Sequence, residues 1–226
     1  MSLSTVTYSA KDGIGRVVLD RPAQLNAISP ALLEDLDMVC AAIEGDPTVR
    51  AVTLTAAGRA FCAGADLKAV RELSPDPEKW ARFMRLWHRV FNRIEALPVP
   101  VVAGVQGLAL AGGLELTLVA DLVVADEGAR LGDQHANFGL VASGGGSQRL
   151  PRLIGARRAK EMMLLGGWLS AAQALDWGLV NRAFDVDLAS GLELELSLVA
   201  AHMRTAEAAE GLRAFAEKRK PVFHAP

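Results

Sequence analysis

Apolar and polar positions alternate over two short segments near the start of the chain, Thr5–Ser9 and Ile14–Asp20. Alternation with a period of two is typical of strands that are buried on one face. Between these segments, Lys11-Asp12-Gly13 supplies turn residues. The two segments are therefore predicted to form a β-hairpin.

Two later stretches have the apolar spacing of helices. Ser29 is a helix-capping residue followed by Pro30 at the first helical position, and Asp76-Pro77 repeats this arrangement. The apolar stripes are Leu32, Leu33, Leu36, Val39, Cys40 and Ile43 in the first helix, and Trp80, Phe83, Met84, Trp87, Phe91 and Ile94 in the second. Such regular spacing indicates that the aromatic side chains belong to the core or an interface rather than to a ligand site.

Three further apolar runs are predicted to be strands: Val49–Thr55, Val99–Val105 and Leu122–Ala125. Strands that alternate with helices favour the α/β class. At 226 residues, the chain is long enough for one domain with a full core.

The segment Gly107–Asp121, GLALAGGLELTLVAD, departs from simple packing patterns. Gly112 and Gly113 permit close approach of backbone, and Leu114–Ala120 is predicted to be a short buried helix. Unpaired N–H groups at a helix start suit a developing oxyanion. Glu115 lies in the first turn of this helix among leucines, where an acid is costly without a partner or a chemical role. This combination indicates an active site.

Composition excludes some classes of function. The chain is 51% hydrophobic and 22% charged with a formal net charge of −2, which gives no reason to expect nucleic acid or an anionic membrane as a partner. Its two cysteines, Cys40 and Cys62, form neither a disulfide framework nor a metal-binding spacing, and both are interpreted as packing residues. No signal-peptide pattern or membrane-spanning run is visible, so the chain is expected to be cytoplasmic.

Six motifs in a fixed order resemble the crotonase superfamily, the enoyl-CoA hydratase/isomerase family. The resemblance runs from about Arg21 to Phe184 and resumes near the end of the chain. The motifs are RPAQLNAIS (21–29), FCAGADLK (61–68), the Gly-Gly-x-Glu segment (112–115), GLVASGGGSQRLPRLIG (139–155), LSAAQALDWGLVNR (169–182) and AFAEKRKPVF (214–223). The resemblance implies a right-handed spiral of ββα units followed by a C-terminal helical region. It also implies assembly as a homotrimer or a dimer of trimers.

On this resemblance the chain divides into a spiral core with the acyl-CoA site, residues 1–187, and a C-terminal helical region, residues 188–226. Helices are predicted at Leu188–Met203 and Thr205–Lys218. This region is shorter than in most family members, which have additional helical segments there. Because of this difference, the sequence does not determine whether a lid covers the acyl pocket or which oligomer forms.

The resemblance also assigns catalytic roles. The backbone N–H groups of Ala65 and Gly112 match the family's oxyanion-hole donors, and Glu115 matches the first of its two catalytic glutamates. The position of the second glutamate is occupied by His135. Imidazole can perform acid–base chemistry near neutral pH, so His135 is a candidate replacement. The alternatives are that it lines the pocket or bonds Glu115 or Asp133.

Contacts to coenzyme A carry over to five positions of the two loops that match the family. They are Leu25, Ala27, Ala63, Asp66 and Lys68. Asp66 has a simpler interpretation as a helix cap, and Lys68 as a surface lysine. Coenzyme A belongs to the substrate, and neither a metal nor another cofactor is implied.

The resulting prediction is an acyl-CoA enzyme that acts through an oxyanion-stabilised enolate, most simply a 2-enoyl-CoA hydratase or isomerase. Two alternatives remain open. His135 is compatible with another reaction of the family, such as thioester or carbon–carbon bond hydrolysis. The chain is also compatible with an acyl-CoA-binding protein without catalysis, although such a protein has no evident reason to bury Glu115.

Overall fold

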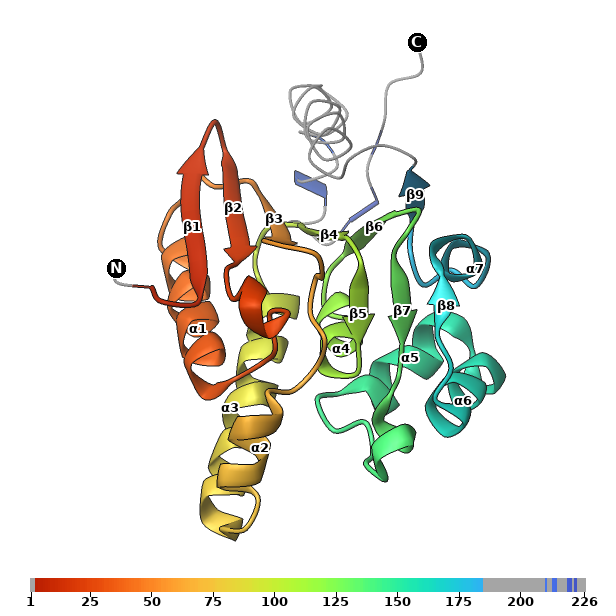
Figure 1. The fold of residues 1–226 in the computed structure, drawn as a ribbon. Helices are drawn as coiled ribbons and strands as arrows, with labels where there is room; N and C mark the ends of the chain where they lie inside the picture. The colour runs from red at the N-terminus through yellow and green to blue at the C-terminus, as the bar shows by residue number, and fades with distance from the viewer. Residues whose placement is uncertain (1–2, 185–209, 211–212, 215–218, 221, 223–226) are drawn as a thin grey trace. The chain divides into compact units, whose positions relative to one another are not determined.

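The larger sheet of this computed structural model begins with the predicted hairpin (Figure 1). In the described part of the chain its strands are ordered β1-β2-β3-β4-β6-β9, with β1 and β2 antiparallel and every later pair parallel. The strands are β1 (Val6–Lys11), β2 (Ile14–Leu19), β3 (Ala51–Ala56), β4 (Val101–Val105), β6 (Leu122–Asp126) and β9 (Arg182–Phe184). The hairpin and the three predicted later strands are confirmed, with ends shifted by one or two residues.

A smaller sheet lies beside the larger one and contains β5 (Leu108–Leu110), β7 (Arg130–Gly132) and β8 (Leu169–Ser170), in that order. Cys62 extends this sheet through a bridge to Ala109. Each of β4 and β6 therefore passes directly into a strand of the smaller sheet before the chain turns into a helix. This repeated strand–strand–helix path confirms the predicted spiral of ββα units.

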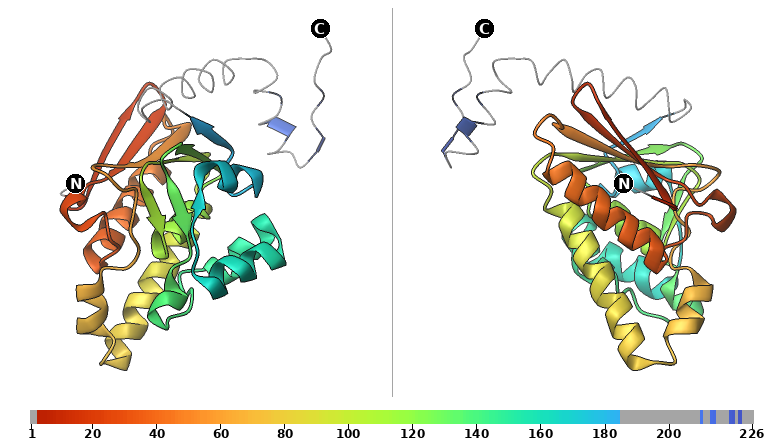
Figure 2. Two further views of the ribbon diagram at one scale, coloured as in Figure 1. Left: turned by 45° about the vertical axis from the view of Figure 1, so that its right-hand side comes forward. Right: turned by 90° about the vertical axis from the view of Figure 1, so that its left-hand side faces the viewer.

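Helices cover the sheets in the way that their apolar stripes require. In the described residues these are η1 (Pro22–Gln24), α1 (Pro30–Glu44), α2 (Leu67–Leu73), α3 (Pro77–Glu95), α4 (Gly112–Thr117), η2 (His135–Phe138), α5 (Gly146–Ile154), α6 (Ala156–Leu165) and α7 (Ala171–Asp176). The two long helices, α1 and α3, pack side by side beneath the larger sheet (Figure 2).

Capping fixes the starts of both long helices. The Ser29 hydroxyl accepts a hydrogen bond from the Leu32 N–H at 3.2 Å, and the Asp76 carboxylate accepts bonds from the Glu78 and Lys79 N–H groups. All six residues of the α1 stripe are buried, as predicted.

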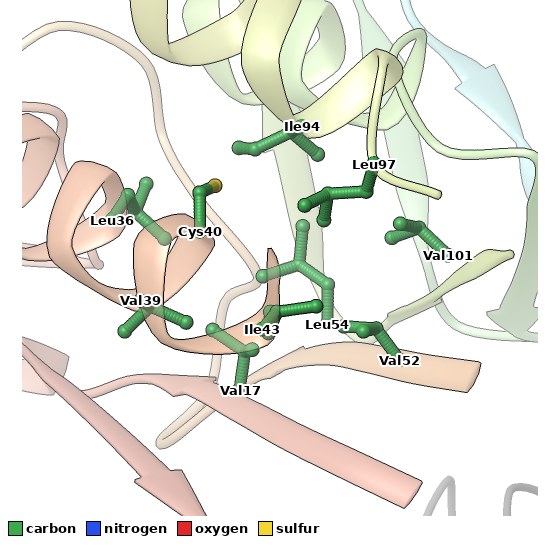
Figure 3. A pocket seen from close by; sticks show the side chains of 10 residues that line it. All are labelled: Val17, Leu36, Val39, Cys40, Ile43, Val52, Leu54, Ile94, Leu97 and Val101. Atoms are coloured by element: carbon green, nitrogen blue, oxygen red, sulfur yellow. The ribbon is translucent and has the colours of Figure 1, made fainter. Parts of the chain in front are cut away.

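A small cavity remains in the core between α1, α3 and the sheet (Figure 3). Its volume is about 20 Å³, and its lining is aliphatic apart from Cys40. Burial raises the pKa of the Cys40 thiol to about 12, so this sulfur behaves as an apolar group. The cavity is a packing defect without polar partners and is not a substrate site.

The structure describes residues 3–184, 210, 213–214, 219–220 and 222. Contacts within the chain divide it into two units, residues 1–185 and 186–226. The predicted helices at 188–203 and 205–218 lie almost entirely outside the described residues. Every residue of the candidate site lies in the first unit.

Candidate active site

The turn between β5 and α4 brings two distant loops into contact. The Leu110 N–H donates to the Cys62 carbonyl at 3.0 Å, and the Ala111 N–H donates to the Gly132 carbonyl at 2.9 Å. Ala111 has a φ of 49°, an unusual conformation for a residue with a side chain. At Gly113 a Cβ atom would lie 2.0 Å from the Cys62 carbonyl oxygen, so only glycine allows this approach.

Two backbone N–H groups are left without a protein acceptor where these loops meet. Among the hydrogen bonds of the described residues, neither Ala65 nor Gly112 donates through its N–H. The loops are close here, because a Cβ atom at Gly64 would lie 3.6 Å from the Gly112 nitrogen. The structure therefore brings the two predicted oxyanion-hole residues together.

Helix α4 carries Glu115 into the interior, where its side chain is only 1% exposed. Its Oε1 atom accepts hydrogen bonds from the Gly144 and Gly146 N–H groups, both at 2.8 Å. Burial raises the pKa of this carboxyl above its ordinary value, although the two N–H groups and the nearby charge of His135 oppose the shift. A carboxyl group with a raised pKa is suited to accepting and returning a proton.

The triple glycine at the start of α5 forms the cradle for this carboxyl. A Cβ atom at Gly144 would lie 2.5 Å from Glu115 Oε2, and one at Gly146 would lie 2.9 Å from Glu115 Oε1. Gly144 and Gly146 therefore pack directly against the Glu115 carboxyl, and a side chain at either position would displace it.

Gly144→Ala is expected to reduce turnover strongly and to destabilise the fold by about 1–3 kcal/mol, because the added methyl group displaces the Glu115 carboxyl. Enzyme assays and thermal denaturation measure the two effects. Gly167→Ala is the matched control, since a Cβ atom there meets no other atom within 4 Å. Wild-type activity in Gly144→Ala would show that the position of Glu115 is not critical.

His135, at the start of η2, is held by Asp133. Its Nδ1 lies 2.8 Å from Asp133 Oδ1, which also accepts the His135 backbone N–H at 3.1 Å. The carboxylate of Asp133 is 1% exposed and can only accept here, so Nδ1 carries the hydrogen and Nε2 is the nitrogen free for chemistry. Burial disfavours the protonated imidazole and lowers the His135 pKa. The hydrogen bond to Asp133 and the charges of Asp133 and Glu115 have the larger effect, so the His135 pKa is raised overall.

A cavity of about 460 Å³ adjoins these groups. Pockets of this size accommodate small-molecule ligands. The predicted site residues that line it are Ala27, Ala63, Ala65, Asp66, Lys68 and His135. The other three, Leu25, Gly112 and Glu115, do not line it. Glu115 therefore lies behind the cavity wall, whereas His135 faces the cavity directly.

The predicted coenzyme A residues have clear structural contacts of their own. Asp66 caps α2 and forms an ion pair with Arg21 at 2.9 Å, which confirms the capping interpretation. Lys68 is largely exposed at the cavity rim. The Leu25 carbonyl accepts a hydrogen bond from the Ala63 N–H at 3.0 Å, so this residue shapes the loop beside the cavity.

Cys62 packs within the loop, in line with its interpretation as a packing residue. It is fully buried, and this burial raises the pKa of its thiol to about 12. In the described part of the chain, no group of three His, Cys, Asp or Glu side chains is arranged to hold a metal ion. Over the same residues, no helix is both long and apolar enough to cross a bilayer.

Sequence reasoning missed two features of this site. It left Asp133 as one of several candidate partners for His135. It also assigned Trp87 only to the core, whereas the Trp87 indole lies against Gly112 and Gly144 at this site. The aspartate two residues before the histidine was the available signal for the first. Nothing local indicated the second, because Trp87 comes from a distant helix.

Comparison with known proteins agrees with this geometry. The sequence model of the family described as enoyl-CoA hydratase/isomerase matches residues 9–187. The chain is 36% identical to YngF of Bacillus subtilis, over 92% of this chain and 93% of that protein. It is 33% identical to the enoyl-CoA isomerase/hydratase fer4 of Mycosarcoma maydis, over 99% of both.

Solved structures give the same result. The crystal structure of an enoyl-CoA hydratase from Bacillus anthracis superimposes with a TM-score of 0.77 at 33% identity, covering 97% of this chain and 99% of that one. A structure from Geobacillus kaustophilus reaches a TM-score of 0.84 at 26% identity, over 99% and 97% of the two chains. The chain belongs to the enoyl-CoA hydratase/isomerase family.

Proposed function

We propose that the protein hydrates 2-enoyl-CoA thioesters. The observation that carries this proposal is the buried carboxyl of Glu115. It interacts electrostatically with the His135–Asp133 pair and lies in the first turn of the helix that begins at the free N–H of Gly112. The names of the relatives support the same substrate class. Coenzyme A enters as part of the substrate, along the cavity rim formed by Ala63, Asp66 and Lys68.

In this reaction the thioester carbonyl oxygen binds the N–H groups of Ala65 and Gly112. Glu115 takes a proton from water, whose oxygen forms a bond to C3 of the enoyl group. The π electrons of the double bond move to the carbonyl oxygen and form an enolate, which the two N–H groups stabilise. Protonated His135 then supplies the proton to C2 from Nε2.

The overall reaction adds one water molecule across the double bond and involves no oxidation or reduction. After turnover Glu115 holds a proton and His135 lacks one, and solvent exchange restores both. Asp133 assists because its carboxylate stabilises the charged ring and fixes the tautomer.

Asp133→Asn tests this arrangement through pH dependence. His135 is active as an acid when protonated, so activity is expected to fall as pH rises through its raised pKa. Removing the Asp133 charge lowers that pKa and moves the alkaline limb of the kcat profile to lower pH. Measuring kcat against pH for both proteins checks this. An unmoved alkaline limb would contradict the assigned role of His135.

Thioester hydrolysis is a second candidate, favoured by the Asp133–His135 pair. Neutral His135, oriented through Nδ1, has a free Nε2 with which it can activate water toward the thioester carbonyl. Incubation with crotonyl-CoA separates the two reactions. Hydration gives 3-hydroxybutyryl-CoA, whereas hydrolysis releases free coenzyme A, which a thiol reagent detects. Tight binding without either product supports a non-catalytic acyl-CoA-binding protein.

We further propose that the protein acts in the cytoplasm as a homotrimer or a dimer of trimers, as the family resemblance implies. Exposed apolar side chains on the first unit, including Leu164, Leu165 and Trp168, offer surface that an assembly would cover. Light scattering of the purified protein measures its molar mass, and a monomeric mass would contradict this assembly.

A further inference from the structure

Trp87 on α3 has a buried polar atom that packing does not explain. Its side chain belongs to the aromatic stripe of the core and is 4% exposed. Yet its indole Nε1 is one of four buried side-chain nitrogen or oxygen atoms without a hydrogen-bond partner in the described part of the chain. Buried indole N–H groups ordinarily find an acceptor, so this donor indicates a partner outside the protein chain.

The indole lies at the active site between two glycines. A Cβ atom at Gly112 would lie 2.6 Å from its Cζ2 atom, so the ring packs directly behind one oxyanion-hole residue. A Cβ atom at Gly144 would lie 2.6 Å from Nε1 and 2.5 Å from Glu115 Oε2. The indole donor and the free oxygen of the carboxyl therefore lie against the same glycine.

The carboxyl is arranged so that this oxygen is available. Both N–H groups of the glycine cradle bond to Oε1 of Glu115, and none of the described residues donates to Oε2. A neutral donor and a carboxylate oxygen beside each other can hold one water molecule. The water accepts from the indole and donates to the carboxylate, which leaves its second lone pair for attack.

We propose that the Trp87 indole N–H binds the oxygen atom that is added to the substrate, first as water and then as the 3-hydroxyl of the product. This inference rests on the proposed hydration. The indole gives and takes no proton in the reaction. It orients the water whose proton passes to Glu115 Oε2, while the water oxygen forms its bond to C3.

Two measurements test the role of Trp87. Trp87→Phe keeps an aromatic ring and removes the donor, so kcat is expected to fall about tenfold, the effect of one neutral hydrogen bond. Trp80→Phe, on the same helix and in ring contact with Phe83, is the control and should keep its activity. Wild-type kcat in Trp87→Phe would overturn the proposal.

The second measurement does not depend on turnover. The chain has four tryptophans, and Trp87→Phe identifies the indole N–H signal of Trp87 in the NMR spectrum of isotope-labelled protein. This signal is expected to shift when 3-hydroxybutyryl-CoA binds and to stay in place with butyryl-CoA. An equal shift with both ligands, or none with either, would overturn the proposal. A selective shift in a protein that shows no hydration would support binding of the 3-hydroxyl by the Trp87 indole, while rejecting the hydratase function.

Discussion

Glu115→Gln is expected to lower kcat for hydration by about 10²- to 10⁴-fold, the range for loss of a general acid–base group. The amide oxygen can still accept from the Gly144 and Gly146 N–H groups, so the cradle stays intact. Stopped-flow or steady-state assays with crotonyl-CoA measure the loss, and titration with butyryl-CoA shows whether binding is retained.

Glu34→Gln is the matched control, because it makes the same chemical change at an exposed position of α1. It should leave kcat unchanged. If Glu115→Gln also kept wild-type turnover, Glu115 would not be the proton acceptor. If it lost acyl-CoA binding together with turnover, the carboxyl would have a structural role in forming the site.

His135→Gln is expected to have the second largest effect, a fall in kcat of about 10²- to 10³-fold, because the amide cannot protonate C2. His135→Glu should retain more activity than His135→Gln. The negative charge of Asp133 disfavours ionisation of the carboxyl introduced at position 135. This repulsion raises the pKa of the new carboxyl and favours its protonated, proton-donating form. The steady-state kcat of the two variants gives the comparison.

His88→Gln, at an exposed position of α3, controls for the loss of a histidine elsewhere. Equal activity of His135→Gln and the wild type would remove His135 from the mechanism. Negligible wild-type turnover that His135→Glu restores would show that the scaffold is competent for hydration but that the native reaction is different.

The long elements were predictable because their signals are local. Ser29 and Asp76 cap their helices within three residues, and the apolar stripes of α1 and α3 repeat over many turns. The smaller sheet was not predictable, since β8 has two residues and β5 and β7 have three each. Such short strands are defined by their neighbours rather than by their own pattern.

The short buried helix shows the same limit. It was predicted at Leu114–Ala120, whereas α4 spans Gly112–Thr117. Glycine usually disfavours helices, but contact of Gly113 with the Cys62 carbonyl leaves no room for a side chain there. Tertiary packing therefore sets the start of α4.

At the active site, sequence motifs pointed to Ala65, Gly112, Glu115 and His135. In the structure Ala65 and His135 line the cavity, whereas Gly112 and Glu115 lie outside its lining. The support around them was not predictable. The bond between Gly144 and Glu115 spans 29 positions of the chain, and Trp87 reaches the same point from a third element. Contacts of this kind follow from the fold and have no local pattern.

The most direct test of the central claim is the mass of the product formed from crotonyl-CoA in heavy-oxygen water. Hydration through Glu115 and His135 predicts a 3-hydroxyacyl-CoA thioester with one heavy oxygen atom, formed rapidly by the wild type and only very slowly by Glu115→Gln. Unlabelled isomeric enoyl-CoA, or labelled free acid with released coenzyme A, would contradict the claim and identify isomerisation or hydrolysis as the reaction.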